Sequence, residues 1–267
     1  MKTSRLKSTV IAVLALVNAF LLVLLLSRKQ QERAARERAG AQLVQLFAAG
    51  GVELPASLVP MRPARLASVE PARDLNAEGA FAAALLGVCE SEDVGGGIYR
   101  YDSSVGQCLL RASGAVEASL ERDVEDPEAF AERFFDSFGY AALSSDLSGG
   151  SGTVVAVRML SGVMVFNAEL HLTFSENRLV SVSGSFVPPA EAGGYGEESD
   201  GVTALVRFLD YSNGSGEVCT AISDVRSGYL LQSTASAAQR LIPAWSVTTD
   251  VAKYYVNSAT GEVSRRA

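Results

Sequence analysis

The sequence has few of the side chains that build metal and catalytic sites. Its 267 residues include one histidine, His171, and three cysteines, Cys89, Cys108 and Cys219, without a C-x-x-C spacing. Zinc and related metal sites need several such ligands at short, regular spacings, so we expect no metal centre. The cysteines allow two interpretations: a Cys89–Cys108 disulfide in an oxidising compartment, or three small buried hydrophobic residues.

Motifs of enzyme chemistry are also missing. Gly95-Gly96-Gly97 is not followed by the Gly-Lys-Ser/Thr of a phosphate-binding loop, so we interpret it as an ordinary loop. Carboxylates are abundant, but none form a pair whose spacing would position an acid and a base. We therefore predict no catalytic residues, no cofactor and no enzymatic activity.

Charge is absent from one long run, Val10 to Leu26, whose only polar residue is Asn18. With Ser8, Thr9 and Ser27 as tolerated ends, its length matches a hydrocarbon core of roughly 30 Å at about 1.5 Å per helical residue. The run predicts a cytoplasmic tail over 1–9 and a transmembrane helix over 10–27. A cleaved signal peptide would end at a small-x-small site, and the first one, residues 39–41, lies far downstream.

Basic residues flank this run on both sides, which bears on its orientation. Lys2, Arg5 and Lys7 precede it; Arg28, Lys29, Arg33, Arg36 and Arg38 follow it. The positive-inside rule taken literally would keep the large domain in the cytoplasm, but long domains translocate largely regardless of charge. We expect a single-pass protein of the cell membrane with a cytoplasmic N-terminus and the large domain extracytoplasmic.

The remainder of the chain is acidic. Residues 1–38 hold 8 basic and 2 acidic residues, so residues 39–267 hold 15 basic and 28 acidic ones, a net charge of −13. Such a domain is a poor ligand for nucleic acid or anionic lipid. Its length suffices for one large or two small hydrophobic cores.

Residues 28–74 are expected to join the membrane helix to the globular part. Good helix formers predict a juxtamembrane helical stalk over 28–51, ended by Gly50-Gly51. Its last turns carry Leu43, Val44, Leu46 and Phe47, which either pair with a partner's stalk or dock onto the chain's own first domain. Four prolines (Pro55, Pro60, Pro63 and Pro71) make 52–74 a connector with one short strand.

Residues 75–188 are expected to form a first α+β region of two helix-and-meander units. In the first unit, Asn76 is the predicted N-cap of a helix through about Val88, followed by strands at 98–102, 107–111 and 116–122. In the second, Asp126-Pro127-Glu128 begins a helix whose four phenylalanines, Phe130, Phe134, Phe135 and Phe138, recur at helical spacing until Gly139. These aromatic residues either pack in the core or line a ligand groove.

Three strands follow this helix, at 153–160, 163–174 and 178–187. In the middle one the even positions from Met164 to Phe174 are apolar and Asn167, Glu169, His171 and Thr173 occupy the other face. This alternation is typical of a half-buried antiparallel strand. His171 is therefore expected to face solvent or a partner.

A linker over 189–199 precedes a C-terminal unit, residues 200–267, with the same order of elements. Asp200 is its predicted N-cap, for a helix that carries Val202, Leu205, Val206 and Leu209 and ends at Asn213-Gly214. Strands are expected at 217–222, 229–232, 241–249 and 252–257. The predicted fold class is α+β: an N-terminal transmembrane helix followed by repeated units of a helix and an antiparallel β-meander.

Several stretches resemble the YycH/YycI regulatory proteins. They are the basic start, the apolar run with its central Asn18, the Gly50-Gly51-Val52 stop and the closing segments Leu241 to Trp245 and Tyr254 to Val263. The final strand and turn also resemble the PepSY module. The resemblance implies a membrane-anchored, non-catalytic regulator whose membrane helix and extracytoplasmic domain contact a sensor histidine kinase, a sister regulatory protein or both. The alternative is a PepSY-like cell-envelope module that binds a peptide or inhibits a protease without any kinase.

The membrane helix itself offers a surface for such a contact. Ala12, Ala15 and Ala19 share one helical face, and Asn18 borders it. Small residues allow a second helix to approach closely, and a polar amide in hydrocarbon seeks a hydrogen-bonding partner. These four residues are the candidate interface, although alanine as filler and a self-associating Asn18 would produce the same pattern.

Overall fold

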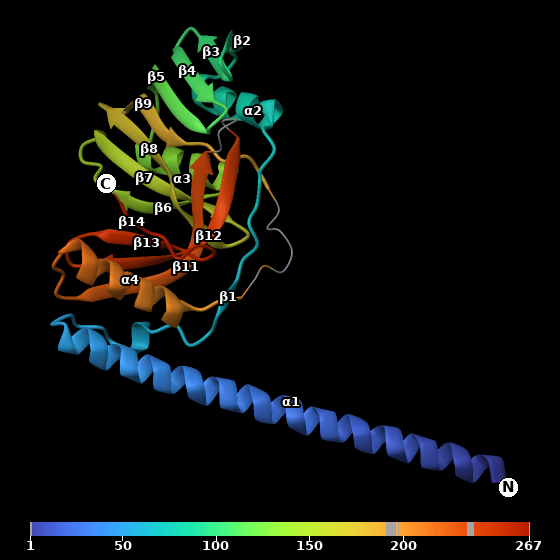
Figure 1. Cartoon of the computed structure of the whole chain (residues 1–267). Helices are drawn as coiled ribbons and strands as arrows, with labels where there is room; N and C mark the ends of the chain where they lie inside the picture. Colours follow the sequence, from blue (N-terminus) through green and yellow to red (C-terminus); the bar gives the residue numbers. More distant parts are fainter. Residues whose placement is uncertain (1, 191–195, 197, 234–237, 267) are drawn as a thin grey trace.

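The computed structural model describes residues 2–190, 196, 198–233 and 238–266; within the first helix, the side chains of residues 2–15, Ala19 and Lys29 lie outside this description. One long N-terminal helix leads into a mixed α+β body built on a large, mostly antiparallel sheet (Figure 1). The predicted fold class is confirmed at this level.

Helix α1 (Lys2–Ala49) is continuous over 48 residues, which corresponds to about 72 Å of length. It ends as predicted at Gly50-Gly51, where Gly51 has φ +79° and the amide of Val52 donates to the carbonyl of Phe47. Its N-terminal part projects away from the body (Figure 1). Within the described part of the chain, no helix combines the length and apolar character needed to span a membrane.

Three helices are each followed by a four-stranded antiparallel meander, so the predicted order of elements is confirmed. The first unit is α2 (Leu75–Leu86), β2 (Glu90–Gly95), β3 (Ile98–Ser103), β4 (Gly106–Arg111) and β5 (Ala115–Asp123). The second is α3 (Pro127–Phe138), β6 (Tyr140–Ser145), β7 (Gly152–Leu160), β8 (Val163–Ser175) and β9 (Arg178–Ser185). The third is α4 (Gly201–Ser215), β11 (Ile222–Ser233), β12 (Gln239–Thr249), β13 (Lys253–Asn257) and β14 (Val263–Arg265).

The three meanders share one 12-stranded sheet that branches at β8. Strand β5 pairs with β9, and β8 pairs in parallel with β11 through Val165 and Tyr229, which gives the order β14-β13-β12-β11-β8-β9-β5-β4-β3-β2. Strands β7 and β6 extend from the other edge of β8. In the connector, the 3₁₀ turn η1 (Ala56–Leu58) precedes β1 (Ala64–Arg65), the one short strand expected there; β1 pairs with β10 (Glu198–Ser199).

A side-chain amide reinforces the short β8–β11 junction. Asn167 Nδ2 donates to the carbonyl of Leu231 at 2.8 Å, and the amide of Leu231 donates to Asn167 Oδ1 at 2.7 Å. The side chain thus makes the pair of hydrogen bonds that a neighbouring strand would make. It adds a second point of attachment between the C-terminal unit and β8.

Helices α2 and α3 pack on the same region of the sheet and enclose the largest core. Phe81 of α2 lies at the centre of its aromatic cluster, with ring centroids 5.2 Å from Phe134, 5.1 Å from Phe138 and 4.9 Å from Phe186. Of the four phenylalanines of α3, Phe134 and Phe135 are buried and the other two pack partly buried against the core. The stripe therefore packs mainly in the core, as one of the two interpretations expects, although Phe138 also lines a pocket.

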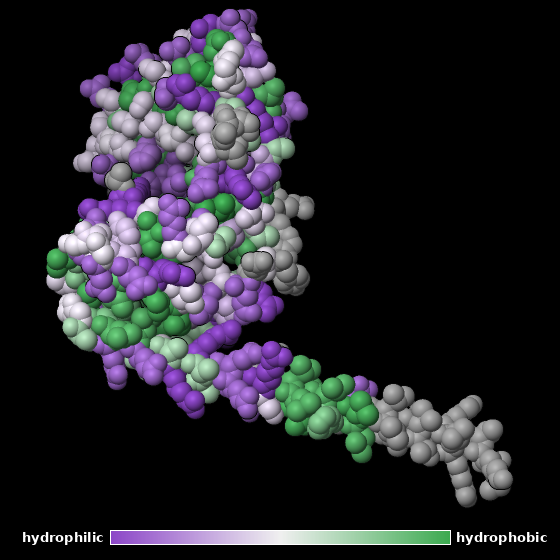
Figure 2. Space-filling view, in the orientation of Figure 1, coloured by the Kyte–Doolittle hydropathy of each residue, from purple (hydrophilic) through white to green (hydrophobic). Residues whose placement is uncertain are grey.

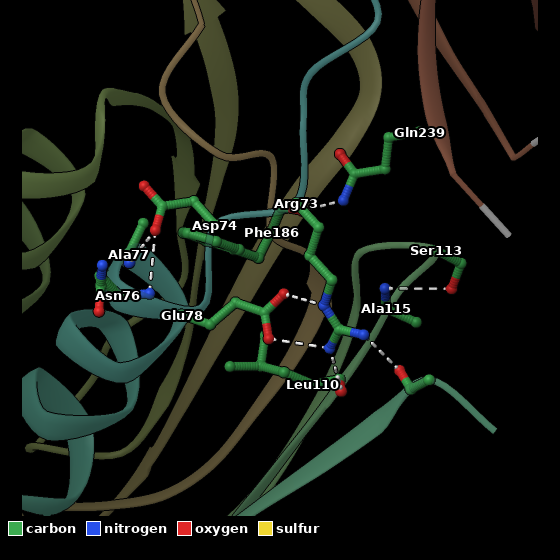
Figure 3. Close-up of polar contacts among 11 residues, drawn as sticks. Arg73, Asp74, Asn76, Ala77, Glu78, Leu110, Ser113, Ala115, Phe186 and Gln239 are labelled. Atoms are coloured by element: carbon green, nitrogen blue, oxygen red, sulfur yellow. Dashed lines mark hydrogen bonds and ion pairs between the residues drawn. The ribbon is translucent and has the colours of Figure 1, made fainter. Parts of the chain in front are cut away.

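Two helix boundaries differ from those predicted. Asp74, not Asn76, caps α2: Asp74 Oδ1 accepts from the amides of Asn76 and Ala77 at 2.9 and 3.1 Å (Figure 3). Helix α4 begins at the predicted cap Asp200 but continues past Asn213-Gly214 and ends at Gly216, which has φ +71°. A helix ends where its glycine adopts the left-handed conformation, and the sequence does not show which of two nearby glycines will do so.

Four strands were missed: β2, β6, β10 and β14. All residues of β2 and five of the six residues of β6 are exposed, while β10 and β14 span only two and three residues, so none shows the apolar alternation of a half-buried strand. The strand expected at 217–222 is wrong, because residues 217–220 are not in a strand. The strand expected at 229–232 is confirmed but is longer than predicted, because β11 runs from Ile222 to Ser233. Gly96 and Gly97 form the turn between β2 and β3, and they share a positive φ with Gly95, the last residue of β2.

A buried ion pair holds the connector against the first unit (Figure 3). Glu78 of α2 is 3% exposed and receives two hydrogen bonds from Arg73, at 2.7 and 2.9 Å. Arg73 also donates to the carbonyl of Gly97 at 2.9 Å. The hydrogen bond to Glu78 raises the pKa of Arg73. A charge buried in this way is tolerated only while its partner is present.

Replacing Arg73 by Met should therefore leave the Glu78 carboxylate buried and unpaired. We expect the free energy of unfolding to fall by about 3 kcal/mol, measured by urea denaturation of the full chain in detergent. Adding Glu78→Leu should restore much of the loss, because it removes the stranded charge.

The matched control is Arg111→Met, which breaks the exposed pair of Arg111 with Glu117, 3.3 Å apart. This change should cost less than about 1 kcal/mol. Equal losses in Arg73→Met and Arg111→Met would show that burial of Glu78 does not govern the effect.

Candidate functional site

A belt of large apolar side chains surrounds the part of α1 that projects away from the body. Its described members are 46–72% exposed and occupy positions 16, 17 and 20–26: Leu16, Val17, Phe20, Leu21, Leu22, Val23, Leu24, Leu25 and Leu26. Figure 2 shows this apolar belt as a continuous green band on α1. Exposed apolar area of this extent marks a surface that contacts lipid or another protein.

The four residues of the candidate helix interface lie on or beside this belt. Asn18 is exposed, on the part of α1 that projects away from the body (Figure 1). The side chains of Ala12, Ala15 and Ala19 lie outside the described residues, although the backbone is helical at all three positions. The interface remains a prediction, and its exposed member, Asn18, is free to contact a second helix.

The other end of α1 docks onto the body. Leu43 and Phe47 are each 1% exposed, and the ring of Phe47 lies 6.3 Å from that of Phe208 on α4. Phe208 in turn lies 5.0 Å from Tyr254 of β13. Helix α4 is thus packed between the sheet and α1, as Figure 1 shows.

This docking decides between the two interpretations of the stalk, and it corrects one detail. Leu43 and Phe47 pack on the chain's own body, while Leu46 is 56% exposed. The unit they contact is the C-terminal one, not the first domain. The physical reason is the apolar outer face of α4, which no strand covers and which α1 covers instead.

The connector fixes the same end of α1 from a second side. Gly40 is buried beneath Met61 and Val59; a Cβ atom at Gly40 would lie 2.9 Å from Met61 Cε and 3.2 Å from Val59 Cγ1. A larger residue at position 40 would push the side chains of Met61 and Val59 aside. The last turns of α1 are therefore held by both α4 and the connector.

A basic groove lies between the apolar belt and this docked end. It encloses about 540 Å³, and its charged lining consists of four arginines, Arg33 and Arg36 of α1 and Arg62 and Arg65 of the connector, and three glutamates, Glu32, Glu37 and Glu198. Arg36 and Arg65 pair with Glu198 at 3.2 and 3.6 Å. Arg33 and Arg62 form no ion pair with any residue that the structure describes. The arginines of α1 are evident from the sequence, but no local pattern indicates that the proline-rich connector brings two more beside them.

His171 lies on β8 beside a buried carboxylate. Its Nε2 is 3.6 Å from Glu169 Oε2, and its side chain is 41% exposed. Glu169 is 8% exposed and also accepts a hydrogen bond from Arg266 near the C-terminus. The prediction that His171 faces outward is correct, and the carboxylate beside it is paired with an arginine.

The cysteines are all free thiols, so the Cys89–Cys108 disulfide is not formed. Cys108 and Cys219 are buried, and burial raises the pKa of Cys108 to about 12. Cys89 is only partly buried, which corrects the expectation of three buried cysteines. No group of three or more potential metal ligands occurs among the residues described.

Comparisons with known proteins give little further guidance. No family model and no curated protein matches the chain. A crystal structure of an uncharacterized protein from Eubacterium rectale ATCC 33656 is similar, with 12% identity and a TM-score of 0.44 over 76% of this chain and 81% of that one. The Bacillus megaterium YpeB C-terminal domain is similar over 74% of this chain and all of that one, with 11% identity and a TM-score of 0.37. At these values neither similarity supports a conclusion about function.

Replacing Phe47 by Ala should detach the stalk from the body. The change removes a ring that is 1% exposed and stacked on Phe208, so we expect a loss of about 3 kcal/mol in the free energy of unfolding. Denaturation of the full chain in detergent, with limited proteolysis near residue 50, measures both effects.

Leu46→Ala is the matched control, because Leu46 is the neighbouring residue on the same helix and is 56% exposed. It should change stability by no more than about 0.5 kcal/mol. If both variants behaved alike, α1 would not be docked as described.

Proposed function

We propose that the protein is a membrane-anchored, extracytoplasmic accessory regulator of a sensor histidine kinase, similar to the YycH/YycI proteins, and that it acts by protein–protein contact. The proposal rests on the contrast between the two ends of α1. One helix bears an apolar belt that is exposed on every side, and its last turns are built into the core of the body.

The apolar belt supports the proposal that this part of α1 lies in a membrane. Apolar residues surround the whole helix instead of forming one stripe, and a helix that is apolar all round is stable only when it is enclosed by lipid or protein. The uncharged run continues from Leu16 back to Val10 in the sequence, which gives it the length of a bilayer span.

The docked end of α1 supports a role in signalling. Because α4 and the connector both hold residues 40–47, a tilt or shift of the membrane helix would move the body with it. A partner helix that binds at Asn18 would thereby control where the body lies. A flexible tether would not transmit such a change.

The charges next to the belt fit the surface of a membrane. Arg33 lies seven residues beyond Leu26, about 10 Å along the helix, and the basic groove opens beside it. Arginine side chains just beyond the end of a membrane helix reach the headgroup region on either side of the bilayer. The acidic remainder of the body would then face away from the bilayer, on the extracytoplasmic side.

A second candidate function is a PepSY-like envelope module that binds a peptide or inhibits a protease. The observation that favours it is the threefold order of helix and meander, which persists in the C-terminal unit from α4 to β14. Both candidates require an anchored body outside the cytoplasm. They differ in the partner.

Membrane anchoring can be tested with charges placed inside and just outside the belt. Leu21→Arg combined with Leu24→Arg should move the chain from the membrane fraction to the soluble fraction, since each arginine costs about 3 kcal/mol near the centre of a membrane helix. Gln30→Arg with Gln31→Arg adds the same charge beyond the belt and should leave the chain in the membrane.

Protease added to wall-stripped cells should digest the body of the native chain; a protected body would overturn the proposed extracytoplasmic orientation.

The partner can be identified by a photo-crosslinking amino acid at position 18 in the native membrane. A crosslink to a sensor histidine kinase or a sister regulatory protein supports the first function, and a crosslink to a protease supports the second.

Asn18→Leu should weaken the helix contact in a membrane two-hybrid assay, since an interhelical amide contributes on the order of 1 kcal/mol. An unchanged signal would exclude Asn18 from the interface.

A further inference from the structure

A buried arginine lines a pocket that the proposed regulatory contact does not use. Arg158 of β7 is 6% exposed, and its side chain borders a cavity of about 370 Å³ between the ends of α2 and α3. The other walls are largely apolar: Ala77, Ala80, Phe138, Phe186, Val187 and Pro189, with Ser137 and Gly139.

Arg158 has no negatively charged partner among the residues described. Its Nη1 donates to the carbonyls of Phe138 and Gly139, at 2.6 and 2.8 Å, and its guanidinium lies 5.6 Å from the ring centre of Tyr140. Its Nε is buried and has no hydrogen-bond partner in the described structure. Burial lowers the pKa of Arg158, which shows that the site disfavours the charge as it stands.

One explanation is that Arg158 only caps the C-terminal end of α3, where its charge meets free carbonyls and the negative end of the helix dipole. Arg122 makes the same kind of cap on α2: it donates to the carbonyls of Ala84 and Leu85 and lies 5.1 Å from the ring of Phe130. Arg122 remains partly exposed and is not part of this pocket. Capping therefore does not require the burial that Arg158 undergoes.

The surrounding geometry holds Arg158 in this place. Gly139 ends α3 with φ +69°, and a Cβ atom there would lie 2.0 Å from Arg158 Nη1. Tyr140 O–H donates to the carbonyl of Ser185 at 2.7 Å and accepts from the amide of Val187, so the segment that forms the far wall is fixed as well. These contacts therefore fix the shape of the pocket, with the desolvated guanidinium of Arg158 in its wall.

We propose that this pocket binds a small organic anion whose carboxylate pairs with Arg158 and whose apolar part lies against Phe138 and Phe186. A carboxylate would supply the counter-charge that the Arg158 guanidinium lacks among the described residues. The volume lies at the small end of the range for ligand pockets, which restricts the apolar part to about one ring or a short chain. The inference does not depend on the membrane anchor or on the identity of a protein partner.

The test is calorimetric titration of the full chain in detergent with 3-phenylpropanoate and with its uncharged amide, 3-phenylpropanamide, after subtraction of titrations into empty micelles. We expect the carboxylate to bind at least about tenfold more tightly than the amide, because only the carboxylate pairs with the guanidinium. Equal affinities, or no binding of either compound, would overturn the proposal.

Two variants locate the binding site. Arg158→Met should abolish the preference for the carboxylate, and Ala80→Phe, which adds a ring at an exposed residue of the pocket lining, should block both compounds. Arg122→Met is the matched control: it removes the equivalent cap on α2 and should leave binding unchanged. If Arg158→Met fails to fold, Ala80→Phe decides, and undiminished binding by that variant contradicts the proposal.

Discussion

The pairing of β8 is the constraint on which the body depends. One edge of this strand is covered by β7, while the other edge pairs with β9 toward its C-terminal end and with β11 at Val165. Because a strand has only two edges, the second and third units can join at β8 only if one of its edges is divided between β9 and β11, while the first unit joins the sheet through the pairing of β5 with β9. The amide of Asn167 strengthens the shorter of these two contacts by hydrogen bonding to Leu231.

The joining of the units within one sheet also bears on which hydrophobic core each helix packs into. Helices α2 and α3 share the large aromatic core around Phe81, whereas α4 belongs to a separate core with Trp245 and Tyr254. That second core is completed by Leu43 and Phe47 of α1. The C-terminal unit is therefore the one that a movement of α1 would reach first, and the first two units follow through the shared sheet.

Arginine has several different roles in this acidic chain, and burial distinguishes them. Arg73 is matched by the buried Glu78, and Arg36 and Arg65 share Glu198 at the surface. Arg158 is buried without an acidic partner among the described residues, and carbonyl groups and an aromatic ring are its contacts. Residue type alone predicts the same charge for all of them; the environment decides whether that charge is already paired.

Sequence patterns were sufficient where a local physical rule applies. The Asp126-Pro127 start and Gly139 end of α3 follow from capping chemistry, and the long β8 follows from its alternation of apolar and polar residues. The order of helix and meander in three units was predicted for the same reason. Exposed strands such as β2 and β6 were missed because no buried face leaves a pattern in them.

The sequence by itself determined the uncharged run Val10 to Leu26, the acidic body and the scarcity of metal-binding side chains. Each of these depends on composition or on neighbours along the chain. Only the tertiary structure decided that α1 docks on α4, that Arg62 joins Arg33 in one groove, and that Arg158 borders a pocket without an acidic partner in the described chain. These contacts join residues far apart in sequence. Their energies depend on burial and on distance, which no local pattern encodes.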